Sequence, residues 1–80
     1  MRIGEAVRLR ILELCKERNM TVNRLAMLCG MTQSTLANIT GGRNQGTTVS
    51  TVKKICDGLE ITVIEFFDSP LFQNLEQEIV

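Results

Sequence analysis

Residues 21–40 read TVNRLAMLCGMTQSTLANIT and contain two helical patterns that are separated by a connection of only two residues. Thr21 can cap the first pattern, whose apolar residues recur at helical spacing: Val22, Leu25, Ala26 and Cys29. Gly30 ends this pattern, and only two residues later Thr32 can cap a second one, with an apolar stripe formed by Leu36 and Ile39. Because the connection Gly30-Met31 is so short, the two helix axes must cross steeply.

Helical patterns with capping residues continue on both sides of this pair. A first helix is predicted over residues 4–18 and ends at Asn19, and its apolar residues are Val7, Ile11 and Leu14. After the pair, Gly41-Gly42 opens a polar, glycine-rich loop, residues 41–47 (GGRNQGT). Thr48 can then cap a further helix, whose apolar face is formed by Val52, Ile55, Cys56 and Leu59.

The last third of the chain adds two shorter patterns. Thr62 and Glu65 form a T-x-x-E capping box for a short helix through Phe67. Ser69 followed by Pro70 is a typical helix start, and the apolar residues beyond it have helical spacing: Leu71, Phe72, Leu75 and Ile79. The predicted fold is therefore all-α, a compact five-helix bundle over residues 1–68 with a short, amphipathic sixth helix in a C-terminal tail, residues 69–80.

Length and composition exclude several classes of protein. Eighty residues suffice for one small domain, and the absence of histidine excludes His-based metal sites and imidazole-dependent triads. Cys15, Cys29 and Cys56 are too far apart for a disulfide framework or a zinc ribbon, so we expect buried free thiols in a reducing cytoplasm. The carboxylates are scattered and no apolar run approaches a membrane span. We expect a cytoplasmic, non-enzymatic protein without a metal, a cofactor or an evident small-molecule ligand.

The charges cancel overall but not locally. Residues 1–54 hold all nine cations and three acids, a net charge of +6, whereas residues 55–80 hold six acids and no cation, a net charge of −6. Such asymmetry is typical of a basic binding surface followed by an acidic tail. We expect most of the cations on or just before the first helix, which include Arg8 and Arg10, to be solvated.

The second helix of the central pair has an uncharged outward face. Gln33, Ser34, Ala37 and Asn38 lie off the stripe that is buried. The amides of Gln and Asn carry a donor and an acceptor that match adenine in the major groove of DNA, and Ser can contact several bases. An arrangement of two steeply crossed helices with such a face is a helix-turn-helix, whose second helix reads DNA.

The chain resembles the lambda-repressor/Cro (XRE-type) family of helix-turn-helix DNA-binding domains. The resemblance rests on residues 21–40, on the following Gly-Gly-Arg, and on residues 50–67 (STVKKICDGLEITVIEFF), and it extends over about residues 5–68. It implies a small bacterial or phage transcriptional regulator that binds double-stranded DNA, with a recognition helix at about residues 32–39.

The resemblance also implies roles for individual residues. Gln33, Ser34 and Asn38 would face bases, and Thr32 and Thr35 would lie at the groove edge or on phosphates. The loop and the cap that follow would lie against the DNA backbone: Arg43, Asn44, Thr47 and Thr48. Many relatives have Gln where this chain has Val22, so Asn23 or Arg24 would have to supply that phosphate contact.

An excess of apolar residues leaves two interpretations open. Leu9, Leu12, Met27 and Leu28 are apolar at positions that the family usually leaves polar, and the tail adds more. Either the tail folds back over the first two helices, or these residues form the interface of a homodimer that would bind a palindromic operator. The alternative function is a protein-interaction or antitoxin-like module that uses the same fold without operator binding.

Overall fold

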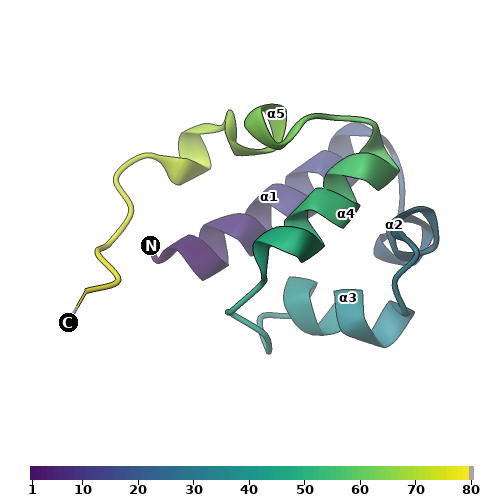
Figure 1. Ribbon diagram of the computed structural model, residues 1–80, viewed down its shortest axis with the longest axis horizontal. Helices are drawn as coiled ribbons and strands as arrows, with labels where there is room; N and C mark the ends of the chain where they lie inside the picture. Colours follow the sequence, from purple (N-terminus) through teal and green to yellow (C-terminus); the bar gives the residue numbers. More distant parts are fainter. Residues whose placement is uncertain (80) are drawn as a thin grey trace.

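The computed structural model describes residues 1–79 and confirms an all-helical fold (Figure 1). Five α-helices are followed by one short 3-10 helix: α1 Ile3–Glu17, α2 Val22–Cys29, α3 Gln33–Thr40, α4 Val49–Leu59, α5 Val63–Phe67 and η1 Pro70–Phe72. Helices α1 and α4 run through the middle of the molecule, α2 and α3 lie on one side of them, and α5 covers the other side.

Four of the five α-helices begin at a threonine that caps them, as the sequence predicts. The hydroxyls of Thr21, Thr32 and Thr48 each accept a hydrogen bond from the backbone N–H three residues later. Thr62 and Glu65 form the complete capping box, in which each side chain bonds the other residue's backbone N–H at 3.0 Å. These local hydrogen bonds set where the helices begin.

One hydrophobic core holds the helices together. Its fully enclosed side chains come from every α-helix and include Ile11, Leu25, Leu36, Ile55 and Phe66. Helices α2 and α4 approach each other closely at Gly58, where an added Cβ would stand 2.7 Å from the Cys29 Sγ. A glycine is needed there because any side chain would push α4 away from α2.

Arg10 is an exception to the predicted solvation of the cations in α1. Its residue is 8% exposed, and its guanidinium donates to the carbonyl oxygens of Phe66 at 2.6 Å and Glu65 at 2.9 Å. It also pairs with Glu13. Carbonyls at a helix C-terminus lack partners within the helix, so Arg10 supplies donors to the end of α5 and joins α1 to it.

The predicted tail helix is wrong beyond its first turn. Only Pro70–Phe72 is helical, and residues 73–79 are not. Asn74 has φ of +57°, and the backbone N–H of Glu76 bonds the carbonyl of Met1 at 3.0 Å and not one within the tail. Apolar spacing alone is not sufficient because so short a helix is marginal without packing, and here only its start packs on the core.

Of the two interpretations of the apolar excess, the fold-back over both helices is not observed. The 3-10 helix η1 packs against α1, where Leu9 and Leu12 are half-buried. On α2, Met27 stays 66% exposed and Leu28 42% exposed. The tail therefore covers part of α1 only.

Candidate nucleic-acid interface

The helix-turn-helix is held by a turn that glycine makes possible. Gly30 adopts the left-handed conformation with φ of +68°, and the N–H of Met31 bonds the carbonyl of Ala26 at 3.0 Å. Ala26 and Leu36 are both fully buried. A small residue on α2 thus lets α3 approach closely and fixes how α3 projects from the body of the protein.

The predicted base-contacting residues share one face of α3. Gln33, Ser34 and Asn38 are exposed, and so is Ala37 among them, whereas Leu36 is buried on the other side of the helix, as is Ile39. A helix has 3.6 residues per turn, so positions 33, 34, 37 and 38 form one continuous stripe. The structure therefore brings together three side chains that can hydrogen-bond to bases.

Three hydroxyls gather at the start of α3. The Thr32 Oγ1 lies 2.7 Å from the Thr35 Oγ1 and 3.4 Å from the Ser34 Oγ, and it accepts from the Thr35 backbone N–H at 3.2 Å. All three residues are exposed. The cap at Thr32 thereby orients the Thr35 side chain. Because its contact to Ser34 is long, the Ser34 hydroxyl stays available to another partner.

The loop after α3 is fixed to the end of that helix. The carbonyl of Asn38 accepts hydrogen bonds from the N–H groups of Arg43 at 2.9 Å and Asn44 at 3.0 Å. The Asn44 side-chain oxygen accepts from the Gly46 N–H at 3.0 Å, a local turn that holds the loop. The positions of Arg43 and Asn44 are therefore coupled to that of the α3 face.

The cations near α3 are few. Arg24 and Arg43 are exposed, and neither forms an ion pair within residues 1–79, so both guanidinium groups can bind a phosphate. Arg8 is half-buried and donates to the Thr40 carbonyl at 3.5 Å. Lys53 pairs with Asp57 along α4. Asn23, beside Arg24 on α2, is exposed as well.

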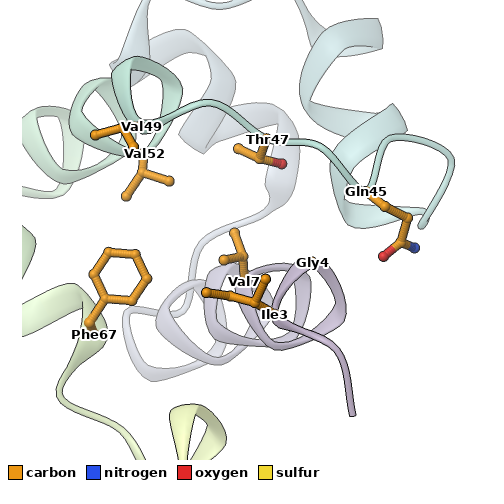
Figure 2. Close-up of a pocket in the computed structure, with 8 residues that line it drawn as sticks. All are labelled: Ile3, Gly4, Val7, Gln45, Thr47, Val49, Val52 and Phe67. Carbon is orange, nitrogen blue, oxygen red and sulfur yellow. The ribbon is translucent and has the colours of Figure 1, made fainter. Parts of the chain in front are cut away.

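An apolar pocket that the sequence did not predict opens beside the loop (Figure 2). It has a volume of about 160 Å³ and lies between the N-terminal turns of α1 and α4, and its lining residues are Ile3, Gly4, Val7, Gln45, Thr47, Val49, Val52 and Phe67. Thr47 is half-buried in this wall and is thus less accessible than the other predicted backbone contacts. Val49 is 80% exposed at the rim. The apolar residues of this pocket come from three segments, residues 3–7, 49–52 and 67, that are 15 or more positions apart in the chain, so no local spacing indicates it.

The three cysteines are free, as expected; Cys15 and Cys56 are buried, whereas Cys29, at the end of α2, is only half-buried. Burial raises the pKa of the Cys15 and Cys56 thiols and, with the nearby thiols, raises that of Cys29 to about 11. Thiols with such pKa values stay protonated at neutral pH and are weak nucleophiles. Within residues 1–79 no helix has the length and hydrophobicity to cross a membrane.

The steep helix pair, the exposed amide-bearing face of α3 and the attached loop together define a helix-turn-helix DNA-binding domain. Residues 10–70 match the model of the Cro/C1-type HTH DNA-binding domain, and the chain belongs to that family of DNA-binding regulators. The fold is also similar to that of a solved structure described as "Crystal structure of the prophage Lp1 protein 11", with a TM-score of 0.77 and 41% sequence identity. That alignment covers 88% of this chain and 93% of the other. No match was found among curated proteins.

Proposed function

We propose that this protein is a small bacterial or phage transcriptional regulator that binds a specific DNA sequence, with α3 in the major groove. One observation carries the proposal: the exposed face of α3 is uncharged and presents Gln33, Ser34 and Asn38 opposite its buried side. A solvated helix face more often carries Glu and Lys. A helix that enters a groove lined by phosphates gains nothing from acidic residues and needs side chains that can pair with base edges.

The residues of this face divide the work of recognition. Gln33 and Asn38 each present a planar amide that can bond the N6 and N7 positions of adenine, and Ser34 can bond either type of base edge. Ala37, between them, has a small side chain that allows the helix backbone to come close to the bases. Phosphate contacts come from Arg24 on α2 and Arg43 in the loop after α3, and they set the affinity and its salt dependence.

The turns that frame α3 supply further backbone contacts. Thr32 and Thr35 lie at the groove edge, Asn23 stands beside Arg24, and Asn44 follows Arg43 in the loop. Thr48 caps α4 at its start, where backbone N–H groups that lack partners within the helix suit a phosphate oxygen. The three free thiols suit the reducing cytoplasm as the place of action.

Selection from random duplex DNA at about 100 mM salt, followed by sequencing of the retained pool, tests this function. We expect one enriched motif. Gln33→Ala should weaken binding to that motif by about 1–3 kcal/mol and relax one base position, while binding to random DNA is unchanged. Gln73→Ala, which removes an exposed glutamine outside the interface, is the matched control. An equal loss on random and selected DNA contradicts the assignment of Gln33 to a base.

We further propose that two copies associate through the pocket beside the loop and bind a palindromic operator as a homodimer. The exposed apolar side chains Ile3, Val49 and Phe67 all line this pocket (Figure 2). None of the residues that line the pocket is charged. A two-fold contact brings identical surfaces together, so a surface without net charge fits a second copy better than a strongly charged partner.

Sedimentation of two variants without DNA distinguishes the candidate dimer surfaces. Val49→Glu places a carboxylate at the pocket rim, in the first turn of α4, where an acidic residue favours the helix. Met27→Glu makes the same change on the exposed face of α2. We expect a dimer that Val49→Glu dissociates and Met27→Glu does not. A monomeric protein with no enriched DNA motif would favour the alternative function, a protein-interaction module with an apolar docking pocket.

A further inference from the structure

The C-terminal segment of residues 73–79, here termed the acidic tail, lies along the start of α1. The Glu78 carboxylate pairs with the Arg2 guanidinium at 2.9 Å. The Glu76 N–H donates to the Met1 carbonyl at 3.0 Å, and the Glu76 carboxylate lies 3.4 Å from the Met1 amine. The tail belongs to the part of the chain, residues 55–80, that has six acids and no cation. The carboxylates of the tail therefore pair with the positive charges of Met1 and Arg2.

The tail is fixed at one end and weakly held at the other. At its base, the Phe72 ring packs on Phe67 with the ring centroids 4.8 Å apart, and Phe72 also contacts the core. Beyond this anchor, hydrogen bonds and ion pairs connect the tail to Met1 and Arg2, and the Arg2 and Glu78 side chains are each about half exposed (55% and 52%). Exposed ion pairs contribute little stability and are screened by salt, so this outer part can detach while the base stays in place.

The end of α1 that the tail contacts lies against the proposed DNA-backbone loop. A Cβ added at Gly4 would stand 2.5 Å from the Gln45 carbonyl oxygen, and one added at Gly42 would stand 3.7 Å from the Arg8 Cδ. Arg2 is only two residues before Gly4 in the chain. Figure 1 shows the tail descending from η1 past the N-terminus. Arg2, the partner of Glu78, is thus connected through Gly4 to the loop that contains Arg43.

We propose that the acidic tail is an autoinhibitory clamp: it competes with DNA phosphates for Arg2 and lowers the sequence-independent part of DNA affinity. The inference rests on the proposed function, because it requires the loop to lie on the DNA backbone. A phosphate near Arg2 attracts the guanidinium and repels Glu76 and Glu78, so DNA binding opens the clamp. Only backbone contacts change, and the choice of bases by α3 is unaffected.

Salt-dependent binding to random and selected duplexes tests the clamp in the 80-residue chain. The test variant combines Glu76→Gln with Glu78→Gln. The control combines Glu17→Gln with Glu60→Gln, which makes the same change in net charge at the C-terminal ends of α1 and α4, with carboxylates that form no ion pair within residues 1–79. All four residues are exposed, so we expect both variants to fold.

Opening the clamp should strengthen binding to both duplexes by the same factor, about three- to tenfold at roughly 50 mM salt. At about 10 Å in water one carboxylate–phosphate repulsion is worth roughly a factor of two, and two carboxylates are removed. The freed Arg2 adds about one phosphate contact, so the plot of log affinity against log salt should steepen by about 0.9. The control should change far less, and in the wild-type protein the Glu76 amide should lose protection from hydrogen exchange when DNA is added.

Three results would overturn the clamp or its basis, and they are distinguishable. If the control gains as much affinity as the test variant, the effect is one of net charge and the clamp is wrong. If the Glu76 amide keeps its protection in the DNA complex, the tail does not open. If no variant binds either duplex at low salt, the proposed DNA-binding function fails together with the clamp.

Discussion

Replacing Arg10 with methionine should destabilise the protein severely, although the substitution removes only one cation from one helix. Methionine keeps an unbranched stem of similar length but has no donors. Two carbonyl oxygens at the end of α5, those of Glu65 and Phe66, then lose their bonds to the guanidinium. Glu13 loses a partner too, but it is partly exposed and can be solvated.

The magnitude follows from the two carbonyls. A buried acceptor left without a partner costs about 1–3 kcal/mol, and bonds from a charged donor lie in the upper part of the usual range. Two such acceptors, partly reachable by water at a helix end, give a loss of about 3 kcal/mol. The whole chain of 80 residues has a stability of only about 4–12 kcal/mol, at roughly 0.05–0.15 kcal/mol per residue. The melting temperature should fall by more than about 10 °C.

Urea unfolding, monitored by circular dichroism, measures this loss of unfolding free energy. Lys16→Met removes an exposed cation from the same helix and should change stability by no more than about 0.5 kcal/mol. Arg10→Lys should fall between the two, because a single ammonium cannot reproduce the planar fork of the guanidinium. A loss below about 1 kcal/mol for Arg10→Met, or equal losses for Arg10→Met and Lys16→Met, would refute the reasoning.

Three further expectations concern the turns and caps. Gly58→Ala should destabilise the protein by about 1–3 kcal/mol despite the better helix propensity of alanine, because its Cβ would meet the Cys29 Sγ at 2.7 Å. Adding Cys29→Ala should recover part of this loss in thermal unfolding. If it recovers none, contact with the backbone of α2 causes the loss. Gly30→Ala should cost about 1 kcal/mol from the left-handed backbone alone, since no atom lies within 4 Å of the new Cβ; an unchanged unfolding midpoint would contradict this. The hydrogen bonds to Thr62 lower the pKa of Glu65 below its usual value, so the charged carboxylate stabilises the fold above that value and stops doing so as the pH falls through the lower pKa of the folded state. The difference in unfolding free energy between wild type and Glu65→Gln should therefore shrink on acidification. A difference that grows would contradict this assignment.

Much of the candidate interface could be predicted from the sequence because its pattern is local. The exposure of Gln33, Ser34 and Asn38 follows from the positions of Leu36 and Ile39 on the same short helix, and the cap at Thr32 sets where that helix begins. The half-burial of Thr47 could not be predicted, because it depends on α1 and α5, which build the other walls of the pocket.

The sequence by itself determined the five α-helices, the threonine caps of four of them and the turn at Gly30, since each depends on residues within about four positions of one another. The tertiary structure alone decided the burial of Arg10, whose carbonyl partner Phe66 is 56 residues away, and the path of the tail, whose Glu78 meets Arg2 across 76 residues. The apolar spacing of the tail favoured a helix, but the contacts at Met1 and the left-handed Asn74 prevailed. Local spacing predicts which residues face a core, whereas only the assembled helices determine which distant groups come within hydrogen-bond reach.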